Sequence, residues 1–496
     1  MSLIQISDLT FCYDGSHIPV FSHLDLRLDT SWRLGLVGRN GRGKTTLLRL
    51  LAGGLTPESG AVSCPVATSS FPFPLPAGDW MTLDALEQAA PDLEEWRLIR
   101  ELNLLGVDLD VLYRPLPTLS GGERVKVQLA ALFQQPDAFL LIDEPTDHLD
   151  LAGREAVSAY LGQKSGFLLV SHDRAFLDRS TDHTLALNRE DIQLIQGNFS
   201  VWWMEKSRLD RQHQAQQETL KKDIRRLEEA ARRTADWSRH TEAGKYNTRN
   251  SGLRPDRGFV GHKAAKLMKR SKSVERRQQQ AIAEKEGLLK NIETTQSLFL
   301  RPLAHPKKRL VEIDGFSLDY PRHPPCPVVS FTLFQGDRIA LTGPNGCGKS
   351  SLLNCLAGAE LPHRGTAVLA SGTILSYVPQ DTAWMSGSFA QFAQEGEVDL
   401  TRFLTLLRKL DFGRAVFEQD LSQLSQGQKK KVLLARSICQ QAHLYLWDEA
   451  LNYVDVFSRI QIEELLRETS ASLLLVEHDP TFLEAVGAVP VVFSHT

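Results

Sequence analysis

Two glycine-rich segments of the chain have the residue types and the spacing of a phosphate-binding loop. Each matches Gly-x-x-x-x-Gly-Lys-Thr/Ser, the first over 38–45 and the second over 343–350. A short apolar run precedes the first loop and a longer one follows it, so we expect a strand, the loop and then a helix. In that setting the backbone N–H groups point at a phosphate, Lys44 contacts the β- and γ-phosphates, and Thr45 ligates Mg²⁺. A glycine-rich turn without a ligand is the alternative for an isolated match.

Residues that could activate water beside a phosphate come later in the first half. Asp143 and Glu144 end an apolar run at 139–142, a Ser-Gly-Gly turn lies at 120–122, and His172 ends a further apolar run. At such strand ends Asp143 can hold Mg²⁺, Glu144 can polarise the attacking water, and His172 can contact the γ-phosphate. The Ser-Gly-Gly backbone offers a second anion-binding turn.

These landmarks occur twice at one spacing. Gly38 and Gly343 lie 305 positions apart, and the same separation holds for the loop lysines, for Ser120 and Ser425, and for the two Asp-Glu pairs. The two histidines lie 306 positions apart. Such a repeat excludes a chance match and indicates two copies of one domain. The counterparts in the second half are Lys349, Ser350, Asp448, Glu449 and His478.

Together, these motifs resemble the ATP-binding cassette ATPases, whose Walker A, signature, Walker B, D-loop and switch-histidine motifs occur here in order, twice. The resemblance implies an α/β fold with two P-loop cassettes, ATP and Mg²⁺ as cofactors, and hydrolysis of ATP to ADP and phosphate. In this family the P-loop of one cassette faces the signature of the other, and each ATP lies between them. The chain is therefore expected to be a monomer that forms an intramolecular cassette dimer.

The resemblance also assigns roles to individual residues. The expected catalytic residues are Glu144, Glu449, His172 and His478. The expected Mg²⁺ ligands are Thr45, Asp143, Ser350, Gln380 and Asp448. The expected nucleotide-binding residues are Tyr13, Gly38, Asn40, Gly41, Gly43, Lys44, Thr45, Thr46, Ser120, Gly121, Gly122, Tyr320, Gly343, Asn345, Gly346, Gly348, Lys349, Ser350, Ser351, Ser425 and Gly427. Tyr13 and Tyr320 would stack on adenine, although either ring could instead belong to the core.

The two composite sites are expected to be unequal. Gln380 stands where the family has a glutamine that contacts Mg²⁺ and water. The first cassette has Phe-Pro-Phe-Pro at 71–74 instead, with Pro74 in the place of the glutamine. Gln426 replaces a glycine of the second signature. Both departures fall on the site that Glu144 serves with Ser425 and Gly427 of the opposite cassette. The other site joins Lys349, Asp448, Glu449 and His478 to Ser120 and Gly122.

A basic segment separates the two copies. Residues 206–295 contain 23 Lys and Arg against 12 Asp and Glu, although the whole chain has a formal charge of −3. Apolar residues recur at helical spacing on both sides of a turn near 237–261, which predicts a long antiparallel helical hairpin. We therefore predict a first cassette over 1–196, a linker over 197–302 and a second cassette over 303–496. The charge fits either a solvated coiled-coil face or a polyanionic partner.

The linker also resembles the ABC-F family, paired cassettes without a membrane domain that act on the ribosome. Its block from Lys245 to Lys266 and the missing insertion in the first cassette are similar to the branch that protects ribosomes from lincosamides, pleuromutilins and streptogramin A. The resemblance implies a hairpin in the E site, reaching towards rRNA of the peptidyl-transferase centre and P-site tRNA. The residues expected to contact RNA are Tyr246, Arg249, Arg254, Arg257, Lys263, Lys266, Lys269 and Arg270.

Two other functions fit the same motifs. One is a housekeeping ABC-F translation factor without a drug phenotype, and the other is the ATP-hydrolysing subunit of a membrane exporter. The N-terminus does not read as a signal peptide, and no run approaches the roughly 18 apolar residues that cross a bilayer. We therefore expect a cytoplasmic protein without a membrane partner. The six cysteines show no metal-ligand spacing, which favours free thiols.

Overall fold

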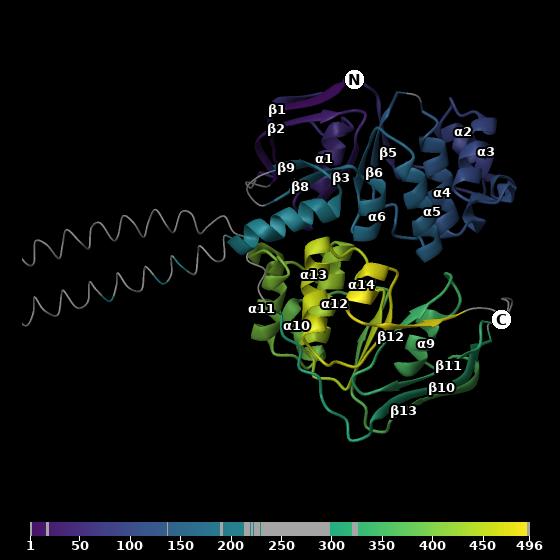
Figure 1. The fold of residues 1–496 in the computed structure, drawn as a ribbon, viewed down its shortest axis with the longest axis vertical. Coiled ribbons are helices and arrows are strands. Elements are labelled where there is room, and N and C mark those ends of the chain that lie inside the picture. Colours follow the sequence, from purple (N-terminus) through teal and green to yellow (C-terminus); the bar gives the residue numbers. More distant parts are fainter. Residues whose placement is uncertain are drawn as a thin grey trace, which may run out of the picture. The chain divides into compact units, whose positions relative to one another are not determined.

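The computed structural model describes residues 2–15, 19–135, 137–188, 192–212, 298–319 and 326–493, with the single residues 219, 222 and 229. It divides into one compact unit, Met1–Ser200 with Thr295–Thr496, and a second unit, Val201–Thr294. The first unit contains two α/β cassettes, coloured purple to blue and green to yellow in Figure 1, so the predicted fold class is confirmed for both halves. The predicted hairpin lies outside the described residues, apart from a helical segment at 199–212.

The first cassette is built on a six-stranded sheet of order β5-β6-β7-β3-β8-β9. Its pairs are parallel except β8 with β9, and the central strands are nearly continuous apolar runs because both faces are covered. The strands are β3 (Arg33–Gly38), β5 (Thr68–Phe71), β6 (Phe139–Asp143), β7 (Phe167–Val170), β8 (His183–Leu187) and β9 (Ile192–Gln196). A second, antiparallel sheet contains β1 (Leu3–Phe11), β2 (Phe21–Asp29) and β4 (Ser59–Ser63).

Four helices of the first cassette, α1, α4, α5 and α6, begin at or directly after motif residues. The phosphate loop leads directly from β3 into α1, and the Ser-Gly-Gly turn leads into α4. The helices are α1 (Lys44–Leu51), α2 (Thr82–Ala89), α3 (Glu95–Leu104), α4 (Gly121–Leu132), α5 (Leu151–Gly162) and α6 (Arg174–Ser180), with short 3₁₀ helices at Leu109–Tyr113 and Leu116–Thr118.

The second cassette repeats this design with a five-stranded parallel sheet of order β14-β15-β16-β12-β17. The strands are β12 (Arg338–Thr342), β14 (Leu375–Val378), β15 (Leu444–Asp448), β16 (Leu473–Val476) and β17 (Val489–Val492). The antiparallel sheet contains β10 (Arg309–Leu318), β11 (Val329–Phe334) and β13 (His363–Leu369). The helices are α9 (Lys349–Leu356), α10 (Phe389–Glu395), α11 (Leu400–Lys409), α12 (Gln426–Cys439), α13 (Val456–Arg467) and α14 (Pro480–Ala485), with 3₁₀ helices at Arg414–Glu418 and Leu421–Gln423.

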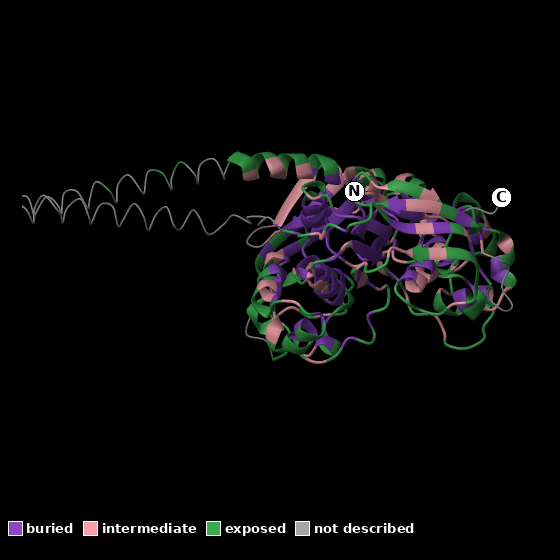
Figure 2. Ribbon diagram, turned by 90° about the horizontal axis from the view of Figure 1, so that it is seen from below, coloured by how far each residue is buried: buried purple, intermediate pink, exposed green. Residues whose placement is uncertain are grey.

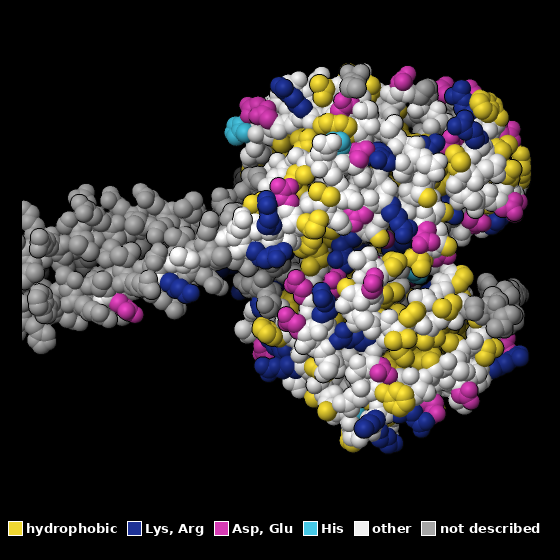
Figure 3. Space-filling view, viewed as in Figure 1, with side chains coloured by type: hydrophobic (Ala, Val, Ile, Leu, Met, Phe, Trp, Pro, Cys, Tyr) yellow, Lys and Arg dark blue, Asp and Glu magenta, His cyan; other side chains and the backbone are white. Residues whose placement is uncertain are grey.

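Each cassette has its own apolar core around its parallel sheet. Figure 2 shows these interior strands and helices in purple, with exposed residues at the periphery. On the face drawn in Figure 3, the basic and acidic side chains of the cassettes are interspersed and do not gather by sign. In the part of the chain that the structure describes, no helix combines the length and the apolar character needed to cross a membrane. Each core packs around a parallel sheet, and the motif loops follow the carboxyl ends of its strands.

Candidate nucleotide-binding sites between the cassettes

The loop after β3 has the backbone conformation that a phosphate cradle requires. Gly43 has a φ of +89°, and a Cβ added there would lie 2.6 Å from Val20 Cγ1, so this position requires glycine. The next residue, Lys44, is buried, and its Nζ donates a hydrogen bond to the carbonyl of Gly38 at 2.8 Å. Burial lowers the pKa of Lys44, because the charged form is desolvated. This ammonium is thus held within the loop whose phosphate it would contact.

Hydroxyl and carboxylate oxygens lie side by side in both cassettes, as a Mg²⁺ site needs. Thr45 Oγ1 donates to Asp143 Oδ2 at 3.3 Å, and Ser350 Oγ donates to Asp448 Oδ1 at 2.9 Å. Burial raises the pKa of Asp143, and it raises the pKa of Asp448 to about 6. Hard oxygen ligands of this kind suit Mg²⁺, and a bound cation would offset the cost of burying the carboxylates. The residues present therefore fit the metal that ATP carries.

The glutamates that follow these aspartates have unusual backbones. Glu144 has a φ of +49° and Glu449 a φ of +45°, a left-handed conformation that is strained for residues other than glycine. The backbone N–H of each donates to the next strand, Glu144 to the carbonyl of Val170 and Glu449 to that of Val476, both at 3.0 Å. Such strain costs about 1–3 kcal/mol and is typical of functional sites. Its presence at the same position in both cassettes supports a shared chemical role.

A cavity of about 430 Å³ contains the first composite site. Phosphate-loop residues line one side of the cavity together with Asp143, Glu144 and His172. The signature turn of the opposite cassette, 425–427, lines the other side. The structure thus brings together the residues that the sequence analysis assigned to this site. Tyr13 also lines the cavity and hydrogen-bonds through its OH to Thr46 Oγ1 at 2.9 Å, a position at the rim that suits adenine stacking.

The cassettes meet head to tail through two equivalent hydrogen bonds. Asn40 Nδ2 donates to the carbonyl of Tyr453 at 2.9 Å, and Asn345 Nδ2 donates to the carbonyl of His148 at 3.3 Å. The two donors lie 305 positions apart, as do the two acceptors, so the pair of contacts follows the internal repeat. His148 and Tyr453 were not among the site residues predicted from the sequence, although their D-loops repeat at the offset of the other motifs. The D-loop carbonyls therefore join each phosphate loop to the opposite cassette.

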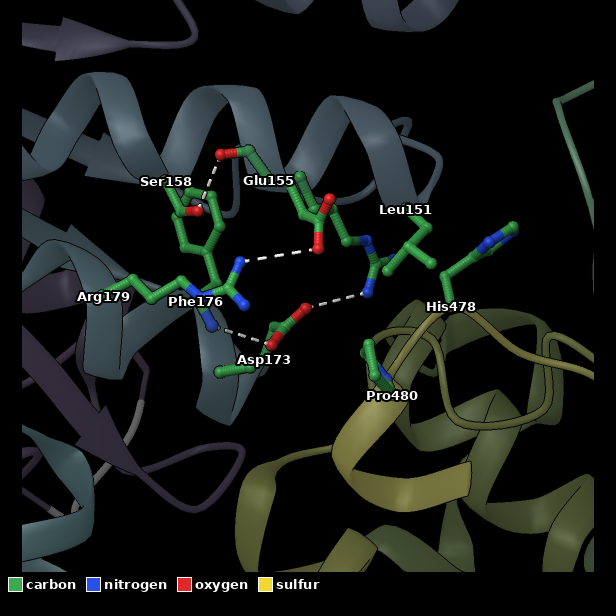
Figure 4. A pocket seen from close by; sticks show the side chains of 10 residues that line it. Leu151, Glu155, Ser158, Asp173, Phe176, Arg179, His478 and Pro480 are labelled. Carbon is green, nitrogen blue, oxygen red and sulfur yellow. Dashed lines mark hydrogen bonds and ion pairs between the residues drawn. The ribbon is translucent and has the colours of Figure 1, made fainter. Parts of the chain in front are cut away.

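A second, smaller cavity lies at the cassette interface. Figure 4 shows that His478 and Pro480 of the second cassette face Leu151 and Asp173 of the first. The ion pair of Arg154 with Asp173, at 3.0 Å, fixes α5 against α6 behind them. This cavity has a volume of about 30 Å³, so it could hold water but no nucleotide. Because both line this cavity, His478 of the second cassette lies near Leu151, which directly follows the D-loop of the first cassette.

Glu449 is held by hydrogen-bonding partners from three motifs. Gln380 Nε2 donates to its Oε2 at 2.8 Å and Asn452 Nδ2 donates to the same oxygen at 2.7 Å. His478 Nε2 lies 3.5 Å from its Oε1. Burial alone would raise the pKa of Glu449, but the hydrogen bonds from His478 and Gln380 outweigh it and lower that pKa. Glu449 is therefore an oriented, ionised carboxylate, as a general base should be.

Glu144 has a different environment. His172 contacts it through Nε2, 3.1 Å from Oε1, and through its backbone N–H, 3.2 Å from Oε2. Among the residues that the structure describes, no amide side chain donates to Glu144, and Asp147 stands at the repeat position of Asn452. Burial, together with the carboxylates of Asp147 and Asp143, raises the pKa of Glu144 to about 8. The two sites are thus unequal in geometry and in charge.

Strand register changes one detail of the sequence interpretation. Val378 pairs with Trp447 in the second cassette, and Phe71 pairs with Ile142, the repeat counterpart of Trp447, in the first. Two residues beyond these pairs lie Gln380 and Phe73. The expectation that Pro74 takes the place of the glutamine is therefore wrong by one position. The stretch from Lys44 to Phe73 is two residues shorter than that from Lys349 to Gln380, so the offset of 305 that relates the other motifs does not hold here.

The other predicted residues have clear positions. Ser120 and Ser425 cap α4 and α12, where the backbone N–H groups of Glu123 and Gln428 donate to their hydroxyls at 3.2 Å and 3.3 Å. Ser351 lies on α9, and Gly348 precedes that helix with a φ of +100°. Tyr320 and the predicted RNA-contacting residues, Tyr246, Arg249, Arg254, Arg257, Lys263, Lys266, Lys269 and Arg270, lie outside the described residues.

Exchanging Asn452 and Asp147, which occupy equivalent D-loop positions, tests whether the two sites differ in activity. Asn452→Asp should lower ATP turnover about tenfold, because it replaces a hydrogen-bond donor to Glu449 with a second carboxylate. Steady-state phosphate release measures the loss, and nucleotide affinity should change little. The matched control is Asp147→Asn in the other cassette, which removes a repulsion and should not reduce turnover. A tenfold loss from the control but not from Asn452→Asp would reverse this interpretation.

Comparisons with known proteins agree with this geometry. A family model described as ABC transporter matches residues 21–147 and 327–452, about half of the chain. The ribosome protection protein VmlR of Bacillus subtilis is 27% identical over 97% of this chain and 85% of its own length. The ATP-binding protein Uup of Caulobacter vibrioides is 29% identical over 96% of this chain and 74% of its own length.

Solved structures show the same fold at lower identity. The archaeal ribosome recycling factor aABCE1, solved with the ribosomal stalk protein aP1, has a TM-score of 0.63 at 20% identity, over 99% of this chain and 88% of that chain. A structure described as RNase-L Inhibitor has a TM-score of 0.61 at 19% identity, over 99% of this chain and 88% of that chain. At these identities the likeness supports the tandem-cassette fold alone.

Proposed function

Because this chain belongs to the ABC transporter family and is an ATPase with two cassettes, we propose that it is an ABC-F-type enzyme that works on the ribosome. The observation that carries the proposal is the combination of two composite nucleotide sites with a basic linker in one chain. Residues 206–295 carry an excess of 11 positive charges between cassettes that are acidic overall. A single basic segment next to two ATP-driven domains suits a polyanionic partner such as rRNA.

In the proposed cycle, ATP binding closes the cassettes and hydrolysis opens them. ATP with Mg²⁺ supplies the phosphoanhydride that is cleaved and the cation that neutralises its charge. In the second cassette Glu449 takes the proton of the attacking water, while Gln380 and Asn452 hold its carboxylate in place. His478 lies next to the same carboxylate and would contact the γ-phosphate. The D-loop contacts carry the state of each site to the opposite cassette.

The linker would give the enzyme its target. We place the predicted hairpin in the ribosomal E site, with its loop directed towards the peptidyl-transferase centre and P-site tRNA. Aromatic residues occur among basic ones in this loop, a composition that suits stacking and phosphate contacts with structured RNA. The closed enzyme would then displace antibiotics that bind at that centre or prevent their binding. The likeness to VmlR, a ribosome protection protein, favours this outcome over a housekeeping role.

Drug susceptibility tests the finer proposal. Cells that express the protein should tolerate higher concentrations of lincosamides, pleuromutilins or streptogramin A than cells that express the Glu144→Gln, Glu449→Gln variant. Shortening the loop at 247–250 should abolish this protection while ribosome binding and ATPase activity persist. Full protection by the shortened variant would refute the mechanism.

Ribosome binding without protection from any drug would instead indicate a housekeeping translation factor. Recovery with membranes and not with ribosomes would indicate an exporter subunit.

Salt dependence tests the role of the linker charge. Changing Lys263, Lys266, Lys269 and Arg270 to Ala should weaken ribosome binding and flatten the slope of log affinity against log salt by about 3, because fewer counterions are released. Co-sedimentation between about 50 and 200 mM salt measures both quantities. Basal ATPase activity is the internal control for folded cassettes. An unchanged slope would mean that these four charges do not contact phosphates.

A further inference from the structure

The second cassette contains a buried lysine that the ATP-binding motifs do not explain. Lys430 lies on the first turns of α12, and only 2% of its surface is exposed. Its Nζ donates to the carbonyl of Pro379 at 3.0 Å and to that of Asp448 at 3.4 Å. An ammonium is rarely buried without a reason, because desolvation is costly. Here the charges of Glu477, Asp448, Glu449 and Asp381 act on it favourably.

Both carbonyls stand where two neighbouring strands end. The parallel pair of β14 and β15 finishes with Val378 opposite Trp447, and the chains then separate into two motif loops. Pro379 and Asp448 are the next residues on each strand. Lys430 thus links the ends of β14 and β15 one residue beyond their last backbone pair, where the two strands no longer hydrogen-bond to each other.

The residues after these two carbonyls perform the chemistry. Gln380 follows Pro379 and Glu449 follows Asp448, and their side chains share a hydrogen bond of 2.8 Å. We propose that Lys430 is a positioning residue of the second site: it holds the carbonyls that precede Gln380 and Glu449 and thereby fixes the hydrogen bond between these two side chains.

The first cassette supports this assignment because it lacks the lysine, the glutamine and the buried glutamate together, although it keeps the Asp-Glu pair. Val125 stands at the position of Lys430, and Phe73 stands at the position of Gln380. Glu477 is replaced as well. It accepts the backbone N–H of Leu451 at 2.9 Å, whereas its counterpart Ser171 contacts the hydroxyl of Thr146. A buried lysine therefore accompanies the glutamine that it would position, and it is missing where the glutamine is missing.

The test isolates the second site in a Glu144→Gln background. There, Lys430→Val should lower kcat about ten- to a hundredfold while the KM for ATP changes less than twofold, since misplacing a catalytic group affects the chemical step. Gln380→Ala should cause a comparable loss. Because both act through one hydrogen bond, the Lys430→Val, Gln380→Ala double variant should lose no more than the larger single loss. Multiplying losses would overturn the proposal, as would an unchanged kcat in Lys430→Val.

A measurement without nucleotide separates positioning from general instability. Hydrogen exchange in peptides that cover 377–382 should be about tenfold faster or more in Lys430→Val, while peptides from 70–75 in the first cassette keep their rates. Faster exchange throughout the second cassette would contradict a local role.

If the single variant does not fold, Lys430→Val with Glu477→Ser copies the first cassette and removes the uncompensated carboxylate. That variant should fold but show the same kcat loss, and recovered turnover would overturn the proposal. Val125→Ala is the matched control and should leave second-site turnover unchanged.

Discussion

Replacing both Glu144 and Glu449 with Gln should reduce ATP hydrolysis by about 10²–10⁴-fold while ATP remains bound. Both residues follow, at a strand end, an aspartate that hydrogen-bonds to the hydroxyl after the loop lysine, and both have the strained backbone described above. The amide keeps the shape of the side chain but cannot accept a proton from water. Phosphate release and equilibrium binding of a fluorescent ATP analogue measure the two effects.

Lys44→Ala with Lys349→Ala is the matched control for this double variant. It should lose nucleotide binding, because each lysine belongs to a phosphate loop and not to the water-activating group. The two double variants therefore separate loss of chemistry from loss of binding. ATPase activity in the glutamate variant within twofold of the unmodified protein would refute the role assigned to both glutamates.

The single variants should differ, with Glu449→Gln costing about tenfold more turnover than Glu144→Gln. Glu449 has a glutamine and an asparagine that orient its carboxylate, whereas Glu144 faces Asp147 and lacks a glutamine partner among the described residues. Gln426 adds to the inequality, since it replaces the signature glycine on the cavity that contains Glu144. The second site should therefore carry most of the turnover.

Single-turnover measurements distinguish the possible outcomes for these variants. If both single variants lose all turnover in the steady state, one round of hydrolysis under limiting ATP still reports which site acts. A larger loss for Glu144→Gln in both assays would show that the asymmetry is reversed. Nucleotide affinity of the two variants serves as the control and should agree within a few-fold.

The internal repeat made most of the cassette fold and most of the site predictable. The repeated glycine loops, Asp-Glu pairs and histidines locate the ends of strands along the chain and the start of the helix after each loop. The chemistry of phosphate binding restricts residue types strongly, so these positions stand out without a structure. Strand ends such as Asp143 and Asp448 were found in this way, and the structure places each next to the expected hydroxyl.

Other features depend on three-dimensional contacts that a motif does not encode. A hydrogen bond to a backbone carbonyl, such as that of Tyr453, is independent of the acceptor's side chain, so its sequence gives no signal. Pro74, and not Phe73, was expected at the position of Gln380, because the pairing of the neighbouring strands that sets this position is not visible in the sequence. Lys430 is the middle one of three consecutive lysines, all buried, and only its hydrogen bonds to the two strand-end carbonyls distinguish it from its neighbours.

ATP-dependent co-sedimentation of the Glu144→Gln, Glu449→Gln variant with purified ribosomes tests the central proposal most directly. With ATP the cassettes should close without reopening, so the variant should pellet with ribosomes in about stoichiometric amounts. With ADP, or with the lysine double variant and ATP, most of the protein should stay in the supernatant. Equal pelleting with ATP and ADP, or no pelleting under either condition, would contradict an ATPase whose nucleotide state controls its hold on the ribosome.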